Sequence, residues 1–359
     1  MVSGRENWLR SRPRRGVLIF FCLMFGITVL ASTQPPNDDG RQAAVPAQPA
    51  QPASGPGSTD YPHAAMQISK HGRGARQFWL FTPAEPQPTQ APIVVFLHGW
   101  GAMDPTVYGA WIKHLVRRGN IVVYPRYQED VRTLPREMTG HAVTAVRDAI
   151  EQLQSSGPVR PDLDRFALVG HSMGAIMSVN IADRASELEL PLVRAVFVAE
   201  PTFEPLVGTY DRIAPETLLV VAIGADVKRD ASARRIFLGS SRVPAANKNY
   251  VVIHSDDHGV PPLVSDHFSP CAAESLDADR DADRRDWRNR TRDALDYFGY
   301  WKLCDGLLDA AFFNRHREFA LGDTPELRFM GRWTDGTPLR EVTVLARTDF
   351  PDQPAEAAR

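Results

Sequence analysis

The chain has 359 residues, 43% of them hydrophobic and 23% charged, and its formal net charge is −2. This composition is typical of a globular protein with one large domain or two small ones. The near-neutral charge balance argues against nucleic acid or an anionic surface as the partner.

The N-terminus has the layout of an export signal. Five arginines near the start precede an uncharged apolar run at residues 16–31, which ends in small residues. We predict a signal peptide over residues 1–31, cleaved after Ala31. Because the run falls only a little short of the ~20 residues of a spanning helix, an uncleaved anchor that tethers the chain to a membrane is the alternative. Either form predicts a periplasmic or secreted protein, and the pair Arg14-Arg15 leaves twin-arginine export open.

The segment after this signal has a linker composition. Residues 32–60 are rich in Pro, Ala, Gln, Ser and Gly, and we expect a disordered linker there. In an oxidising compartment, Cys271 and Cys304 could form a disulfide, and two separate thiols are equally compatible with the sequence.

From residue 61 onward, short apolar runs alternate with helical patterns. The strands predicted in chain order are 65–69, 77–82, 93–97, 121–124, 166–169, 195–199, 218–223 and 250–253. The predicted helices are 106–118, 141–153, 175–185, 231–237 and 292–312. This alternation predicts an α/β domain over residues 61–320, with a mostly parallel sheet of eight-stranded type flanked by helices.

The end of the chain follows a different pattern. In residues 321–359, Leu327, Phe329 and Trp333 alternate before a tight turn at Asp335-Gly336. We predict a C-terminal extension that forms a small hairpin.

One motif dominates the predicted sheet. Gly170-His-Ser-Met-Gly174 stands between an apolar strand and an apolar helical segment. A nucleophile elbow needs a serine in a strained backbone conformation, with glycines that let the strand and the helix approach each other. A glycine-rich turn gives the same letters by chance, but the strand before and the helix after favour Ser172 as the nucleophile. His171 is expected to pack or to form hydrogen bonds rather than to act as the base.

A second turn supports the first. His98-Gly99-Trp100-Gly101 ends the strand at 93–97, and parallel strands bring their carboxyl ends to one edge of a sheet. We predict that the backbone N–H groups of Trp100 and Met173 form an oxyanion hole. Substrate contacts are predicted for His98, Gly99 and Tyr108.

These two motifs, HGWG and GHSMG, resemble those of the α/β-hydrolase superfamily, in its secreted serine esterase and lipase branch. The resemblance covers residues 61 to about 315. It implies the α/β-hydrolase fold, a catalytic triad in the chain order Ser, Asp, His, and a reaction that needs no metal and no cofactor.

The resemblance places the acid after a strand beyond the elbow. Asp226 is the first carboxylate after the strand at 218–223, and we predict it as the triad acid. Asp230 is the alternative, although its position at the start of the next helix is typical of an N-cap.

The base is expected after the last strand. His258 lies in a loop and precedes a glycine, so we predict it as the base. His254 lies at the edge of the strand and is expected to be structural, and His267 is expected to be a structural or pocket residue.

Together these predictions describe an exported serine hydrolase that cleaves carboxylic esters through Ser172, His258 and Asp226 by way of an acyl-enzyme. A serine peptidase, an acyltransferase and a catalytically idle, membrane-tethered binding domain are the alternatives. The short connections after the elbow helix leave no room for a large cap domain, so the site should be open to a small-molecule or lipid-like ester. Its candidate aromatic residues are Trp100, Tyr108, Trp111 and Phe203.

Overall fold

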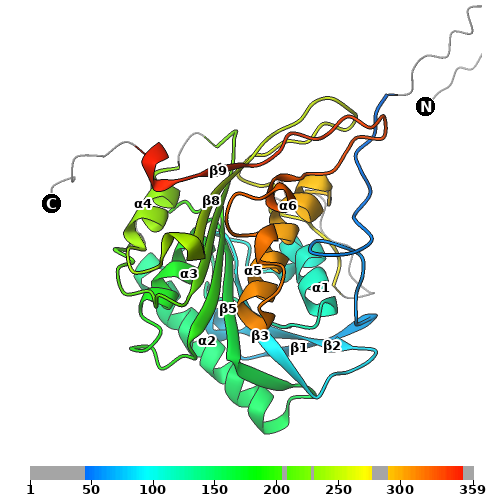
Figure 1. Cartoon of the computed structure of the whole chain (residues 1–359). Coiled ribbons are helices and arrows are strands. Elements are labelled where there is room, and N and C mark those ends of the chain that lie inside the picture. The colour runs from blue at the N-terminus through cyan, green and yellow to red at the C-terminus, as the bar shows by residue number, and fades with distance from the viewer. Residues whose placement is uncertain (1–44, 204–207, 228–229, 277–289, 351–359) are drawn as a thin grey trace, which may run out of the picture. The chain divides into compact units, whose positions relative to one another are not determined.

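The computed structural model describes residues 45–203, 208–227, 230–276 and 290–350. The predicted signal or anchor at 1–31 and the first part of the predicted linker, 32–44, lie outside these ranges. The chain from Val45 onward forms one structural unit, and that unit contains every element described below (Figure 1).

The described residues form a nine-stranded sheet in the order β1-β2-β4-β3-β5-β6-β7-β8-β9. Strands β3 to β8 run parallel to their neighbours, whereas β1, β2 and β9 join the sheet by antiparallel pairing. The predicted mostly parallel α/β sheet is therefore confirmed. The strands are β1 Ala65–His71, β2 Phe78–Ala84, β3 Gln90–Leu97, β4 Ile121–Pro125, β5 Arg160–His171, β6 Val193–Ala199, β7 Leu218–Gly224, β8 Lys248–Ile253 and β9 Thr343–Leu345.

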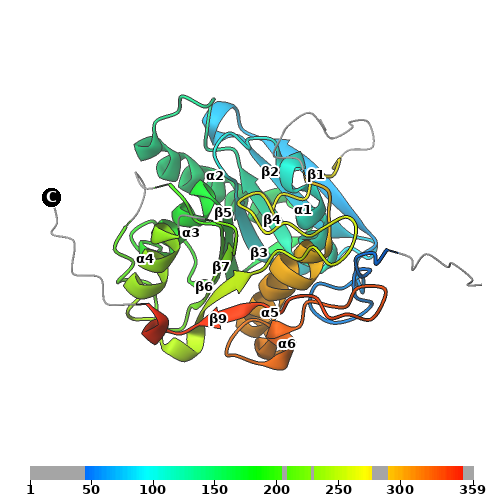
Figure 2. The same ribbon diagram turned by 90° about the horizontal axis from the view of Figure 1, so that it is seen from above.

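Helices cover both faces of this sheet. Seen from above, α2, α3 and α4 lie on one side, and α1, α5 and α6 lie on the other (Figure 2). Their bounds are α1 Gly109–Arg117, α2 Pro135–Ser156, α3 Met173–Asp183, α4 Ala231–Gly239, α5 Trp301–Phe313 and α6 Pro325–Arg328. The predicted terminal helix is divided, since a π-helical segment, Leu295–Tyr300, precedes α5.

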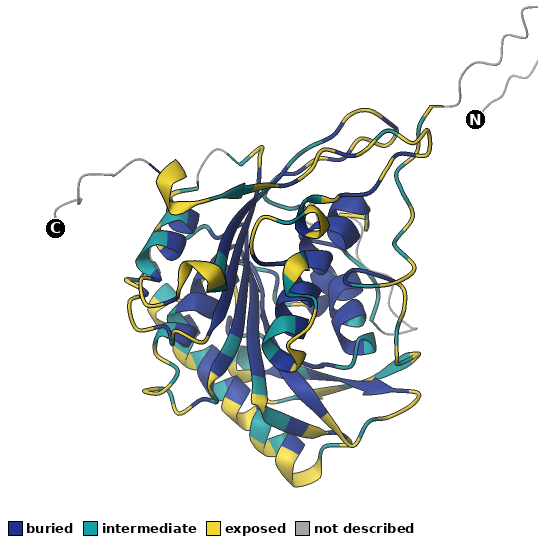
Figure 3. Cartoon of the chain, viewed as in Figure 1, coloured by how far each residue is buried: buried dark blue, intermediate teal, exposed yellow. Residues whose placement is uncertain are grey.

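The alternation of side chains along β3 explains why two cores form. Val94 and Phe96 face the core that contains α1 and α5, whereas Ile93, Val95 and Leu97 face the core that contains α2 and α3. Because successive side chains point to opposite faces, a strand between two helical layers must be apolar at every position. Figure 3 shows the result, with the central strands buried and the outer helix surfaces exposed.

The N-terminal part of the described chain differs from the expected disordered linker. In residues 45–60, the carbonyl of Pro46 accepts a hydrogen bond of 2.9 Å from the backbone N–H of Val260. Farther along, the backbone N–H of Gly57 donates to the carboxylate of Asp305 at 2.7 Å. These partners hold the segment on the folded unit, although its composition is that of a linker.

The C-terminal extension is also part of the main fold. Its predicted turn is present, because Gly336 N–H donates to the carbonyl of Trp333 at 2.8 Å and Arg332 pairs with Pro338. The strand that follows, β9, does not pair with that turn. It adds to the open edge of β8, so the extension forms a short antiparallel hairpin around the turn and then completes the sheet.

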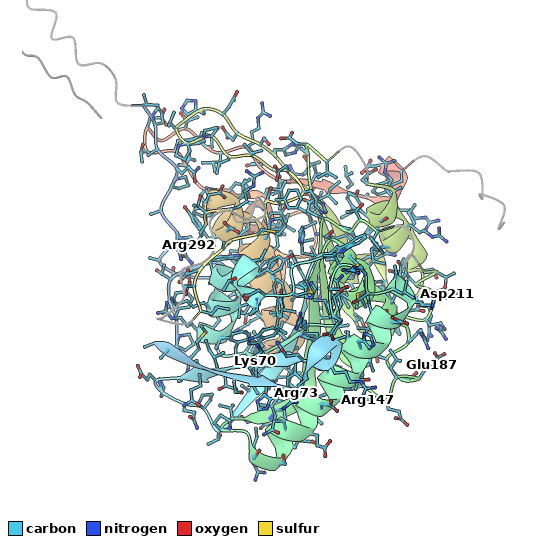
Figure 4. All side chains as sticks on the ribbon, turned by 180° about the vertical axis from the view of Figure 1, so that it is seen from behind. Lys70, Arg73, Arg147, Glu187, Asp211 and Arg292 are labelled. Carbon is cyan, nitrogen blue, oxygen red and sulfur yellow. The ribbon has the colours of Figure 1, made fainter. Side chains whose placement is uncertain are left out.

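Cys271 and Cys304 are both buried, and no disulfide joins them. None of the helices in the described ranges combines the length and the hydropathy that a membrane span requires. The surface seen in Figure 4 carries charges of both signs near one another, such as Arg147 on α2 and Glu187 beyond α3. Arg147 pairs with Glu189 and Glu187 pairs with Arg212.

Candidate active site

The elbow has the geometry that the motif predicts. Ser172 stands between β5 and α3 with φ 57° and ψ −122°, a conformation that an L-residue rarely adopts. A Cβ on Gly170 would lie 2.4 Å from the carbonyl oxygen of Gly174, and a Cβ on Gly174 would lie 2.1 Å from that of Leu97. Both glycines are therefore required for the close approach of strand and helix.

The histidine beside this serine is His267. Its Nε2 atom lies 3.0 Å from the Oγ of Ser172, within hydrogen-bond distance. Burial lowers the pKa of His267 below its ordinary value, and the nearby Asp266 carboxylate opposes that shift. An imidazole that is neutral at neutral pH can accept the proton of the serine hydroxyl.

The structure does not bring His258 to Ser172, so the prediction of His258 as the base is wrong. His258 lies at the surface, where its Nε2 contacts Asp335 Oδ2 at 2.7 Å. The reason lies in the backbone: Asp256 and Leu263 pair with each other through two hydrogen bonds, of 2.9 and 2.8 Å. Residues 256–263 therefore leave the sheet edge and return to it, and they carry His258 away from the site.

The chain comes back to the sheet at Ser265, whose Oγ donates to the carbonyl of Ile253 at the end of β8. Two residues later, His267 reaches the elbow. His254, expected to be structural, contacts the Thr343 hydroxyl at 2.8 Å. The sequence offered only a weak signal for His267, namely a further histidine after the last strand of the predicted parallel sheet.

The predicted acid, Asp226, lies near the histidine loop without reaching the imidazole through any hydrogen bond in the described structure. Its carboxylate accepts from the hydroxyl of Ser255 at 2.5 Å, and its backbone N–H donates to the carbonyl of Ser265. Asp226 is exposed to solvent. Asp230, the alternative, occupies the N-cap position of α4 and bonds Arg234 and Tyr250 instead.

A carboxylate that the sequence reasoning missed lies closer to the elbow. Glu200 directly follows β6, the parallel neighbour of β5, and the residue before it, Ala199, accepts a hydrogen bond from the backbone N–H of Ser172. Glu200 is 2% exposed and has a positive φ of 51°. The available signal was one acidic residue directly after the apolar run at 195–199.

The surroundings of Glu200 leave one of its oxygens open. Oε1 accepts from the backbone N–H of Gly224 at 2.5 Å and from the Tyr300 hydroxyl at 2.8 Å. Oε2 is buried and has no hydrogen-bond partner in the described structure. Burial raises the pKa of Glu200 to about 8, against the opposing effect of these two hydrogen bonds. A buried oxygen without a partner is costly and is often functional.

The turn after β3 lies against the elbow, as predicted. A Cβ on Gly99 would lie 3.2 Å from the Cβ of Ser172, so only glycine leaves this contact relaxed. Trp100 follows it, and Met173 is the first residue of α3, where a backbone N–H has no acceptor within the helix. Both predicted oxyanion donors are thus on segments that border the serine.

His98 and Tyr108, which were predicted to contact the substrate, both have buried side chains. The His98 ring contacts the carbonyls of Gly99 and Arg126 and stacks on Tyr127. Trp111 lies in the core. By contrast, Trp100 is 49% exposed and packs edge-on against Phe203, with ring centroids 5.3 Å apart. These two aromatic rings are the candidates for contact with a substrate.

Within the part of the chain that the structure describes, no three His, Cys, Asp or Glu side chains are grouped so as to hold a metal ion.

A comparison with protein-family models gives a match for this chain. A family model described as Chlorophyllase matches residues 57–221, a range that includes Ser172, the turn after β3 and Glu200. The matched range ends before Asp226, His258 and His267. No curated protein matches the chain. The family match and the sheet topology confirm the resemblance to the α/β-hydrolase superfamily, and they support a hydrolase of the ester-cleaving kind in general.

Proposed function

We propose that this α/β-hydrolase cleaves carboxylic esters by a serine mechanism in which Ser172 is the nucleophile and His267 is the base. The observation that carries the proposal is the 3.0 Å contact between Ser172 Oγ and His267 Nε2, on an elbow with a strained serine backbone. A serine that lies at hydrogen-bond distance from a neutral imidazole is the arrangement that nucleophilic catalysis requires.

The reaction follows from this arrangement. His267 removes the hydroxyl proton of Ser172 while the serine oxygen bonds to the ester carbonyl carbon. The backbone N–H groups of Met173 and Trp100 stabilise the oxyanion of the tetrahedral intermediate. His267 then donates the proton to the leaving alcohol, and an acyl-enzyme remains. Water, deprotonated by His267, attacks the acyl group, and its proton returns to Ser172 as the acid leaves.

Glu200 is the triad acid in this proposal. It lies one strand from the nucleophile, it is buried, and its Oε2 has no partner among the described residues. Gly224 connects Glu200 to the loop that carries His267. Its backbone N–H donates to Glu200, and its Cα packs against Ser265. Asp226 lies one strand farther away, and Ser255 already occupies its carboxylate. The ionised form of Glu200 fixes the imidazole tautomer and stabilises the imidazolium, and the pKa of about 8 makes this form the minor one at pH 7.

A fluorophosphonate probe tests the nucleophile directly. We expect the folded wild-type protein to be labelled and Ser172→Ala to remain unlabelled, with Ser178→Ala, a buried serine on α3 outside the elbow, labelled like the wild type. Absence of labelling in folded wild-type protein would contradict the proposal. A panel of p-nitrophenyl esters and matched peptide substrates then separates an esterase from a peptidase. Chlorophyll belongs in that panel because the matched family is named for it.

Export is a second part of the proposal and rests on the sequence of residues 1–31. A basic flank followed by an apolar run and small residues supports a periplasmic or secreted protein, with the anchored form as the alternative. Fractionation of a bacterial host that expresses the full chain tests it. Cytoplasmic recovery of uncleaved protein that is not bound to membrane would contradict export.

A further inference from the structure

The proposed machinery comes from three separate segments of the chain. The turn Gly99-Trp100 follows β3, the elbow His171-Ser172 follows β5, and His267 lies in the long connection after β8. Catalysis requires these three segments to keep a fixed distance from one another, since a displacement of 1 Å can cost about 100-fold in rate.

Two buried side chains connect all three segments. The backbone N–H of Gly99 donates to the Tyr108 hydroxyl at 2.9 Å, and that hydroxyl lies 2.8 Å from His171 Nδ1. On the other side of the same ring, His171 Nε2 lies 2.7 Å from the backbone carbonyl oxygen of His267. The connection therefore runs from the oxyanion turn through the elbow to the base.

The partners determine the direction of each hydrogen bond. A carbonyl oxygen only accepts, so His171 Nε2 must carry the proton and donate it to His267. In a neutral ring, Nδ1 is then an acceptor, and the Tyr108 hydroxyl donates to it. The oxygen of Tyr108 still has a lone pair for Gly99 N–H. Every polar atom of the connection is satisfied by one tautomer of His171.

The environment keeps this tautomer neutral. Tyr108 is 1% and His171 is 2% exposed. Burial, helped by the neighbouring His267, holds the pKa of His171 well below its ordinary value. The other group that faces Nδ1 is the Cys271 thiol, at 4.0 Å. In such a buried site a broken hydrogen bond leaves an unsatisfied polar group, which is costly.

We infer that Tyr108 and His171 are positioning residues, a hydrogen-bonded relay that fixes the oxyanion turn and the base relative to the nucleophile. They touch no reacting atom, and they act through Gly99 and through the backbone of His267. This inference rests on the proposed ester hydrolysis, whose residues it connects. It assigns a role to the histidine inside the elbow, which is not the base.

Steady-state ester hydrolysis by the full chain measures this role. We expect Tyr108→Phe and His171→Leu to lower kcat by about 10- to 100-fold and to change KM by less than about 2-fold, because the reacting groups are displaced while the binding surface is kept. His171→Gln keeps a donor that reaches the His267 carbonyl, and it should recover part of the loss. Tyr250→Phe also removes one buried tyrosine hydroxyl, which bonds Asp230 at 3.2 Å, and it should keep the wild-type kcat.

Nitrogen chemical shifts from protein labelled with ¹⁵N-histidine test the relay without any activity. We expect His171 to hold its proton on Nε2 and to be neutral at pH 7, with a shifted Nδ1 signal in Tyr108→Phe. A proton on Nδ1, or a doubly protonated ring at pH 7, would overturn the relay. Folded Tyr108→Phe and His171→Gln with wild-type kcat would overturn its positioning role. If wild-type protein hydrolyses no ester, the proposed function fails, and the nitrogen shifts still decide whether the relay exists.

Discussion

The imidazole Nε2 of His267 lies 3.0 Å from the hydroxyl of Ser172, while the backbone carbonyl of the same histidine lies 2.7 Å from His171 Nε2. The side chain of His267 therefore contacts Ser172, and its backbone contacts His171, so the loop is held to the elbow at two points. His258, by contrast, pairs with Asp335 at the surface.

This difference predicts opposite effects of two histidine substitutions. His267→Ala should reduce kcat for a p-nitrophenyl ester by about 10³-fold or more, because the serine loses its base. His258→Ala should keep kcat within about 2-fold. Loss of activity in a folded His258→Ala variant, with activity retained in His267→Ala, would reverse the assignment.

The same comparison separates the two candidate acids. Glu200→Gln keeps the shape of the side chain and removes its ionisable carboxyl group, and we expect kcat to fall by about 10²- to 10⁴-fold, as for other triad acids. Asp226→Asn should change kcat by less than about 3-fold, because its exposed carboxylate bonds Ser255. Steady-state kinetics of the two variants decide the question, and a greater loss in Asp226→Asn would restore the original prediction.

The pH dependence of kcat/KM should reflect His267. Burial lowers the pKa of this histidine, with Asp266 opposing the shift, so the neutral base is present at pH values where an exposed histidine is still protonated. We therefore expect kcat/KM to rise with pH and to pass its midpoint below 6.5. Asp266→Asn removes the opposing carboxylate and should move that midpoint to a lower pH. A midpoint above 7 would argue against a buried base.

Glu200 should make stability depend on pH in an unusual direction. Its pKa is about 8 in the folded protein and about 4.3 in an unfolded chain, so the folded state binds the extra proton between these values. The free energy of unfolding should then fall as pH rises from about 4.3 to 8, by up to about 1.4 kcal/mol per pH unit. Urea unfolding across this range should show that slope in wild-type protein and a smaller one in Glu200→Gln. Equal slopes would contradict the raised pKa.

Asp305 should be important for stability because it joins three segments. Its buried carboxylate contacts His114 at 2.8 Å, Arg118 at 3.1 Å and the backbone N–H of Gly57 at 2.7 Å. Burial opposes ionisation, but Arg118 and His114 hold the pKa of Asp305 below its ordinary value. The stabilisation is therefore present above the pKa of an unfolded aspartate and is lost as pH falls.

We expect Asp305→Ala to lower the free energy of unfolding by about 3–5 kcal/mol, because the buried His114 ring and the Gly57 N–H lose their acceptor and Arg118 keeps only Asp309 as a carboxylate partner. Asp323→Ala breaks an exposed pair with Arg328 and should cost less than about 1 kcal/mol. Thermal or urea unfolding at pH 7 measures both variants. Equal losses in the two would show that the buried network contributes nothing special.

The sheet and the elbow were predictable because they depend on local patterns. Apolar runs such as Ile93–Leu97 are long and continuous, and only a strand between two helical layers needs that composition. Ser172 was predictable because the steric demands of a tight strand-to-helix turn appear directly as glycines at Gly170 and Gly174. The pairing of β9 with β8 could not be predicted from local patterns. The three residues of β9 pair antiparallel with a strand that lies about 90 residues earlier in the sequence.

The sequence by itself determined the strained elbow at Ser172, the glycine turn after β3 and the order of the strands along the chain, because each is encoded within a few consecutive residues. The tertiary structure decided which histidine stands beside Ser172 and which strand ends carry the candidate carboxylates. His267 replaces His258 because residues 256–263 pair with themselves and return to the sheet before the chain crosses to the elbow. Glu200 follows β6, the direct neighbour of β5, whereas Asp226 follows β7, and this spatial order within the sheet is set by long-range pairing.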